Sequence, residues 1–308
     1  MSNERNASVD PRCATRRAEQ GWASLVKMTH ALAEAGWTDL VMAEYDKAFH
    51  DFDEAIRLEP ENAQLYLFRA KAHDCVGESE PAMADCNRAI ELNPGIAEAW
   101  QLRSRLYSMK GQLQQQLEAI NQAIALEPSY GHAYVIRAEI YLGFGDVEQA
   151  LRDSNEAIRL GTPYHGPWYV RGSAYLRTGE YDKAITDFTK GLALSPGDVL
   201  CRLNRGITFR LIGEVKCALA DANEAVQLAP NWYAVYLERA RVNLLKGELS
   251  DVLSDLDQAI RLEPGNPEAH HIRAEANEFL GQAAAAGGDR RIAEDLREKR
   301  GNKGDAAL

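Results

Sequence analysis

A short phrase that closes on proline recurs at a fixed interval along this chain of 308 residues. AIRLEP ends at Pro60, AIELNP at Pro94 and AIALEP at Pro128, so that each proline follows the previous one by 34 residues. A second series keeps the same interval and ends at Pro196, Pro230 and Pro264. A strict period of this length predicts an array of small helical units, each of which contacts only its neighbours.

Each period contains two predicted helices separated by a glycine. The first helix carries an aromatic near its start, at Tyr66, Trp100, Tyr134, Trp168 and Tyr236. A second aromatic follows seven residues later on the same face, at Tyr107, Tyr141, Tyr175 and Phe209. The dividing glycines suit a left-handed helix end and stand at Gly77, Gly111, Gly145, Gly179, Gly213, Gly247 and Gly281. The second helix ends at the proline phrase, because proline cannot continue a helix.

The combination of aromatic, glycine, alanine and proline at this spacing, as in YDKAITDFTKGLALSP at Tyr181–Pro196, resembles the tetratricopeptide repeat. The resemblance covers roughly residues 29–300. It implies an all-α solenoid, a right-handed superhelix of about seven to eight antiparallel helix pairs whose first helices line a concave groove. It also implies a non-catalytic protein–protein interaction scaffold that binds a peptide or a helical segment of a partner in that groove.

The repeats set the expected division of the chain. We expect a disordered tail at 1–14, an atypical N-terminal helical repeat at 15–62, six regular units at 63–266, a degenerate last repeat with a capping helix at 267–300, and a disordered tail at 301–308. In the last repeat, the run AAAAGG is expected to precede a charged helix near Asp289–Arg300. The junction GTPYHGP at Gly161–Pro167 breaks the pattern and is the expected place for a local bend.

Composition excludes several classes of function. The net charge of −11 argues against sequence-independent nucleic-acid binding, which needs a basic stripe. No apolar run is long enough to span a membrane, and the N-terminus lacks the apolar core of a secretory signal. Five cysteines without a CxxC pair indicate reduced thiols and a cytoplasmic protein. Because nucleotide-binding, hydrolase and metalloprotease motifs are absent, we expect no catalytic residue, no metal and no cofactor.

An arginine and an aspartate recur at matching places in the two helices of each unit. When an antiparallel pair turns at the glycine, each arginine lies level with the residue sixteen positions later. The predicted structural ion pairs are Arg69–Asp85, Arg137–Asp153, Arg171–Asp187, Arg205–Asp221 and Arg239–Asp255. Arg103 faces Ala119 instead and is expected to find another acceptor. The arginine series therefore predicts internal pairing rather than a surface for polyanions.

The family geometry also predicts which side chains face the groove. In the fifth to seventh units these are Tyr169, Arg177, Leu203, Ile207, Arg210, Leu211, Leu237, Arg241, Leu244 and Leu245. This set is apolar, with three arginines and no acid, in a protein of negative net charge. Exposed apolar patches rimmed by charge often mark partner sites. We therefore expect the groove to bind a protein segment with apolar anchors and acidic residues.

Three alternatives to this interpretation remain. Several of the leucines can pack between adjacent helices, which leaves little apolar surface. The array can also be a regulatory receptor that closes around a small ligand or a signalling peptide. Finally, it can be a self-associating structural solenoid, with its groove filled by its own terminal helix or by a second copy in a homodimer.

Overall fold

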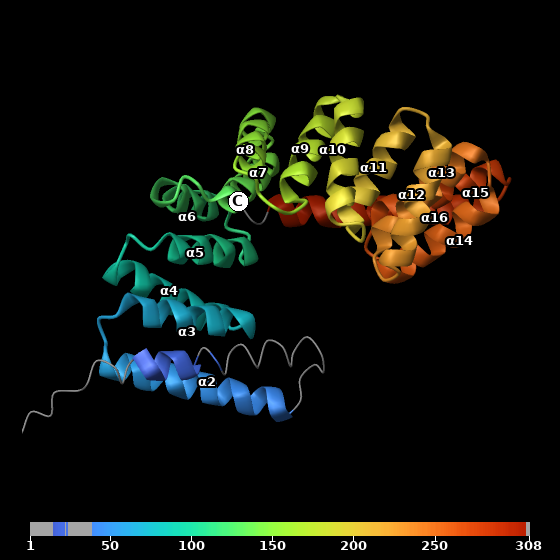
Figure 1. Cartoon of the computed structure of the whole chain (residues 1–308). Helices are drawn as coiled ribbons and strands as arrows, with labels where there is room; N and C mark the ends of the chain where they lie inside the picture. Colours follow the sequence, from blue (N-terminus) through green and yellow to red (C-terminus); the bar gives the residue numbers. More distant parts are fainter. Residues whose placement is uncertain (1–14, 22, 24–38, 306–308) are drawn as a thin grey trace, which may run out of the picture. The chain divides into compact units, whose positions relative to one another are not determined.

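The computed structural model describes residues 15–21, 23 and 39–305, and the regular elements in those residues are all helices. The expected tail at 1–14 and residues 306–308 of the expected tail at 301–308 lie outside them. The chain divides into two compact units, residues 1–144 and 145–308. Within each unit, successive helices lie side by side in chain order (Figure 1). Across the described ranges, no helix combines the length and apolarity needed to cross a membrane.

Among its described residues, the first unit contains a short helical segment at residues 15–21 and six longer helices. These are α2 (Asp39–Leu58), α3 (Ala63–Cys75), α4 (Ser79–Leu92), α5 (Ala97–Met109), α6 (Leu113–Leu126) and α7 (Gly131–Phe144). The short segment packs on α2, where Ala18 is buried with Ala55 and Arg17 binds Asp51 across 3.2 Å. In the first repeat this segment thus supplies the arginine that pairs with the second helix.

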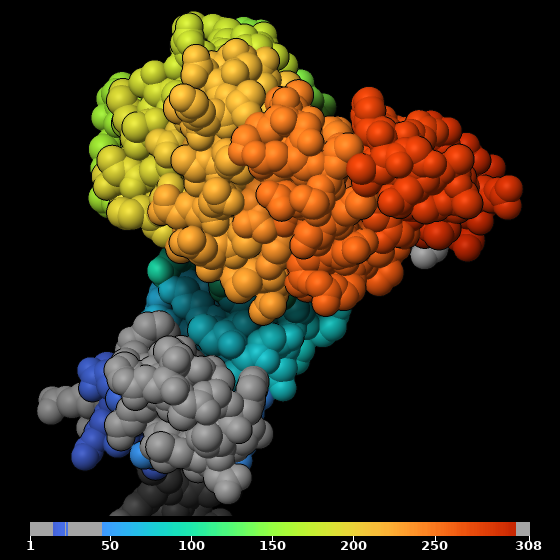
Figure 2. All heavy atoms as spheres, turned by 90° about the vertical axis from the view of Figure 1, so that its right-hand side faces the viewer, coloured from blue at the N-terminus to red at the C-terminus, as the bar shows by residue number. Residues whose placement is uncertain are grey.

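The second unit contains nine helices among its described residues, and each packs against the next. These are α8 (Val147–Arg159), α9 (Gly166–Thr178), α10 (Tyr181–Leu194), α11 (Val199–Leu211), α12 (Val215–Leu228), α13 (Tyr233–Lys246), α14 (Leu249–Leu262), α15 (Pro267–Phe279) and α16 (Ala283–Asp305). Figure 2 shows their surface as successive bands, from yellow through orange to red, since each repeat covers only its neighbours. The junction predicted to bend lies inside this unit and runs from the loop after α8 into the first turn of α9.

Each helix pair turns at a glycine with left-handed backbone. Gly179, for example, follows α9 with a φ of 76°, and the non-glycine residues among those described all keep a negative φ. At such a φ a side chain would meet the following carbonyl group, so only glycine adopts the turn at little cost. The turn directs α10 back along α9 and brings residues sixteen apart to the same level.

The two helices of a pair approach most closely through a glycine in α9. A Cβ atom on Gly172 would lie 2.8 Å from the ring of Phe188, which is fully buried in α10. In the same pair Ala184 has no exposed surface. In the core of this repeat one large ring therefore lies against a position without a side chain, which is close packing rather than loose apolar contact.

In four of the first helices, the aromatic near the start holds the preceding loop through a hydrogen bond. Tyr66 donates a hydrogen bond to the carbonyl oxygen of Pro60 across 3.1 Å, and the Trp100 indole donates to that of Pro94 across 2.8 Å. Equivalent bonds join Tyr134 to Pro128, Tyr236 to Pro230 and, with arginine in the aromatic place, Arg202 to Pro196. The recurrence of these aromatics thus reflects a polar contact as well as packing.

The last helix differs from the expectation. We expected the run AAAAGG to be irregular and a charged helix to span Asp289–Arg300, but α16 begins at Ala283 and ends at Asp305. Alanine is the best helix former, and a glycine inside a helix costs only about 1 kcal/mol, so four alanines outweigh the two glycines. The helix also continues into the segment expected to be a disordered tail.

Candidate interaction surface

The arginines of the repeats are engaged inside the units. In α9, Arg171 donates from Nε to Asp187 Oδ2 across 2.7 Å and from Nη2 to Oδ1 across 2.8 Å. The same two-pronged contact joins Arg69 to Asp85, Arg205 to Asp221 and Arg239 to Asp255. The aspartates are almost fully buried, and the hydrogen bonds that Asp85 accepts from Arg69 raise the pKa of that arginine. Of the five pairs predicted from the spacing, the structure brings these four together.

The fifth predicted pair and one unexpected pair complete the series. Arg137 belongs to the first unit and Asp153 to the second, so this pairing stays a prediction. In the last repeat, Arg273 donates to both oxygens of Asp289 across 2.9 and 2.6 Å. Burial alone would raise the pKa of Asp289, but the hydrogen bonds from Arg273 and His270 outweigh it and lower that pKa. The sequence signal was available, because Asp289 follows Arg273 by the same sixteen residues.

Each paired arginine also reaches the repeat before it. The Nη1 atom of Arg171 donates to Asn155 Oδ1 across 2.6 Å, and that of Arg69 donates to Asp53 across 2.6 Å. One guanidinium group thus ties together three helices from two repeats, with its donors directed at acceptors inside the fold. This arrangement explains why the arginine recurs, and it leaves little of the series available to an anionic ligand.

Arg103 does not find the other acceptor that we expected. Its guanidinium group stacks over Trp100, 4.1 Å from the ring centroid, and its buried Nε atom has no hydrogen-bond partner among the described residues. The expectation was wrong because Ala119 offers no oxygen, and the nearby tryptophan face attracts the cation instead.

Restoring the missing carboxylate is expected to stabilise the chain. Replacing Ala119 with aspartate should raise the free energy of unfolding by about 1 kcal/mol, since Arg103 then gains the partner that its equivalents have. Urea unfolding of the full chain, followed by helical ellipticity, measures the change. In an Arg103→Gln background the same substitution buries an unpaired carboxylate and should destabilise the chain. An equal effect in both backgrounds would contradict the pairing.

The predicted groove residues lie on α9, α11 and α13 but differ widely in exposure. Leu203 and Leu237 are buried, as the first alternative anticipated. Tyr169 and Leu244 are half-buried and pack against the cores of their own repeats. Ile207, Arg210 and Arg241 are also half-buried, whereas Arg177, Leu211 and Leu245 are exposed. The exposed apolar surface is therefore smaller than the set of predicted groove residues implied.

The expectation that this surface contains no acid is wrong. Glu238, which is only 1% exposed, accepts a hydrogen bond from Arg210 Nε across 2.6 Å and another from Arg241 across 3.3 Å. Arg241 also binds Glu268 of the next repeat. Glu238 follows Leu237, one place beyond those that the family geometry assigns to the groove. Two of the three arginines that were predicted to face the groove thus already have carboxylate partners.

Exposed apolar side chains gather where the first helices of the last three repeats end. Leu211 is 47% exposed, Leu245 58% and Phe279 74%, and these residues follow one another by 34 positions. We call these three side chains the apolar stripe. Helix α13 contacts both α11 and α15, so the stripe runs across adjacent helices. Ile212 and Leu280 extend it at the neighbouring place and are also exposed.

Phe279 was missed from the sequence because it lies in the degenerate last repeat. Counting 34 residues from Leu245 would have found it. At the same register in α9 stands Arg177, so the apolar run begins only at α11. Within the described residues, no group of three or more histidine, cysteine, aspartate or glutamate side chains is placed to hold a metal ion.

Two family models match segments of the chain, and both describe the tetratricopeptide repeat. One matches residues 167–198 and the other residues 86–118. Comparison with curated proteins found no match.

Solved structures share the fold at low sequence identity. A chain of the APC/C hetero-tetramer Cut9–Hcn1 aligns with a TM-score of 0.69 and 18% sequence identity. The alignment covers 84% of the present chain but only 53% of the chain from the tetramer. A tetratricopeptide repeat protein from Parabacteroides merdae aligns at 0.60 with 19% identity over 77% of this chain and 93% of its own. YrrB, described as having an unusual peptide-binding site, aligns at 0.50 with 21% identity over 60% of this chain and 95% of its own.

Proposed function

Since the chain is a tetratricopeptide repeat protein with an all-α solenoid fold, we propose that it is a non-catalytic scaffold that binds a segment of another protein across α11, α13 and α15. Proteins with this fold generally mediate protein–protein interactions. The observation that carries the proposal is the apolar stripe, which places three large exposed side chains in line on adjacent helices. Exposed apolar residues in a contiguous row are typical of partner sites.

The spacing of the stripe indicates what the partner presents. Packed helices lie about 8–10 Å apart. A partner helix rises about 1.5 Å per residue, so its apolar side chains would meet successive members of the stripe about seven residues apart. An extended segment would need them about three residues apart. We assign the partner no acidic preference, because Arg210 and Arg241 are already paired with Glu238.

The free thiols support an intracellular site of action. The described cysteines Cys75, Cys86, Cys201 and Cys217 form no disulfide with one another. Because disulfides rarely persist in the cytoplasm, we propose that location.

Selection from a displayed library of random peptides, each about 15 residues long to span three helices, tests the proposal. We expect selected peptides to carry apolar pairs at the spacing given above. Replacing both Leu245 and Phe279 with glutamate should weaken their binding at least about 30-fold, the effect of losing about 2 kcal/mol at a central anchor. Leu194 of α10 is 54% exposed and lies outside the stripe, so Leu194→Glu is the matched control.

Two results would overturn the proposal. Selected peptides that bind the stripe variant as tightly as the wild type would move binding to another surface. The second result would come from sedimentation of the protein across a range of concentrations. If the wild type is a dimer and the variant with glutamate at Leu245 and Phe279 is a monomer, the apolar stripe binds a second copy of this chain and not another protein.

A further inference from the structure

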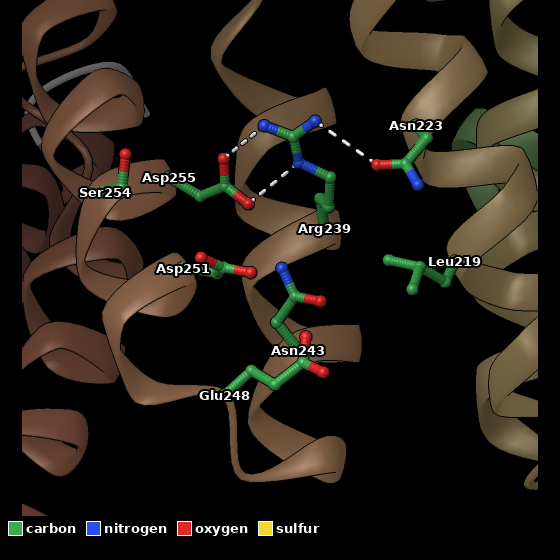
Figure 3. Close-up of a pocket in the computed structure, with 8 residues that line it drawn as sticks. All are labelled: Leu219, Asn223, Arg239, Asn243, Glu248, Asp251, Ser254 and Asp255. Atoms are coloured by element: carbon green, nitrogen blue, oxygen red, sulfur yellow. Dashed lines mark hydrogen bonds and ion pairs between the residues drawn. The ribbon is translucent and has the colours of Figure 1, made fainter.

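A polar pocket opens between repeats of the second unit where the aromatic pattern lapses. Earlier first helices carry Tyr107, Tyr141, Tyr175 or Phe209 at one register, but α13 carries Asn243 there. An amide fills less space than a ring, and a cavity of about 310 Å³ lies beside it, bounded by α12, α13 and α14 (Figure 3). This volume is at the lower end of the range for small-molecule sites.

The charges around this pocket are predominantly negative. Its lining contains the carboxylates of Glu248, Asp251 and Asp255 against the single guanidinium group of Arg239. Asp255 and Arg239 neutralise each other through two hydrogen bonds of 2.6 and 2.9 Å. Glu248 pairs with Lys246 at the exposed rim, 2.7 Å away. Among the described residues, the carboxylate of Asp251 makes no hydrogen bond or ion pair, although its charge acts on Arg239, and the lining keeps a net negative charge.

Asn243 points into the same space without a partner. Its side chain is 4% exposed, and within the described ranges its amide group makes no hydrogen bond. Figure 3 shows the ends of Asn243, Asp251 and Glu248 directed toward one another. The amide opens on the space of the pocket and can bond to a polar group that enters it.

The next repeat offers an internal comparison. The equivalent interstice, of about 350 Å³, has Asn277 at the register of Asn243, and that amide donates to Asp289 across 3.5 Å. Where the first pocket has Glu248 and Asp251, the second has Gln282 and Ala285. An amide and a carboxylate that both lack a hydrogen bond are thus a property of the α13–α14 pocket and not of the repeat in general.

We propose that this pocket binds an organic cation, a guanidinium or primary ammonium group, held by the carboxylates of Asp251 and Glu248 and by the carbonyl oxygen of Asn243. All three can accept hydrogen bonds from such a group, and charge-assisted bonds of this kind are strong. The pocket is larger than a single ion requires, and its side chains form no metal-binding group. The cation can belong to an arginine or lysine side chain or to a free amine.

The pocket is separate from the apolar stripe. Residues two apart on a helix point about 160° apart, so Asn243 faces away from both Arg241 and Leu245. The cation site therefore does not depend on the proposed peptide site, and each can be tested with the other intact.

Titration of the full chain with N-acetylarginine amide, followed by the side-chain amide resonances of Asn243, tests the proposal. N-acetylglutamine amide, which carries no charge, is the control probe. We expect saturable shifts with the arginine probe only. Asp251→Asn should weaken binding at least tenfold, and Asn243→Phe, which restores the ring found at Phe209, should abolish it. Asp182 is an exposed acid in the first turn of α10, so Asp182→Asn should leave binding unchanged.

Asp251 is exposed, so its substitution leaves the fold intact and keeps the test decisive even if Asn243→Phe does not fold. Binding that is equal in the wild type and Asp251→Asn, or no saturable shift with any cationic probe, overturns the proposal. Agmatine separates the two sources of the cation. If the pocket takes a side chain, agmatine and the arginine probe bind alike; if it takes a free amine, the second charge of agmatine improves binding at least tenfold.

Discussion

Replacing Phe188 with alanine is expected to lower the free energy of unfolding by about 4 kcal/mol. The ring is fully buried between α9 and α10, and it rests on Gly172, where even a Cβ atom would lie 2.8 Å away. Truncation removes the apolar contacts of the ring and leaves a cavity that the flat backbone of Gly172 cannot fill. Urea unfolding of the full chain, followed by helical ellipticity, measures the loss.

The substitution Gly172→Ala provides the control for this prediction, because its effect on the free energy of unfolding should change sign when Phe188 is replaced with alanine. With Phe188 present, Gly172→Ala forces the ring aside and should cost about 1–2 kcal/mol. With alanine at position 188, the new methyl group fills part of the cavity and alanine also favours the helix, so the same substitution should stabilise by about 1 kcal/mol. A cost of equal size in both backgrounds would mean that the two residues do not determine each other's packing.

Replacing Arg171 with alanine is expected to cost about 3 kcal/mol. The substitution leaves Asp187, which is 2% exposed, as a buried carboxylate without its two charged hydrogen bonds. Breaking one side of a buried pair costs about 3–5 kcal/mol, and the lower end applies because Arg171 reaches solvent on one side. Thermal and urea unfolding of the full chain measure this loss as well.

An exposed ion pair sets the scale for comparison. Arg152 and Glu148 lie one turn apart on the surface of α8, and removing Arg152 should cost at most about 0.5 kcal/mol. The double substitution Arg171→Met with Asp187→Leu should recover most of the stability lost in Arg171→Ala, because no charge then stays buried. If Arg171→Ala were as mild as Arg152→Ala, the internal pairs would contribute little to the fold.

The helix pairs could be predicted from the sequence because each repeat imposes the same local geometry. Glycine, proline and the sixteen-residue spacing fix the turn, and the turn fixes which arginine meets which aspartate. Exposure could not be predicted in the same way. Leu203 and Leu245 occupy places that the family geometry assigns to one groove, yet the first is 7% exposed and the second 58%. That difference depends on how far along each helix the next repeat covers it.

The features that the sequence did not predict also depend on packing or on a local departure from the repeat pattern. Glu238 lies one place outside the assigned set, and only the packing of α11 against α13 brings it to Arg210. Phe279 belongs to a repeat whose consensus is eroded, although its register is intact. The pocket beside Asn243 results from an aromatic that is absent, and a search for recurring residues does not detect an absence.

The hydrogen bonds to the proline carbonyls give the array a direction. Five loops are held by a side chain from the helix after them, as Trp100 holds Pro94 and Tyr236 holds Pro230. A fragment that stops at a proline therefore leaves its last carbonyl oxygen to water, whereas one that continues six residues further keeps the bond. At these five loops, a truncation from the N-terminal side leaves the later proline bonds intact, whereas a truncation that ends at the proline removes the donor of its bond.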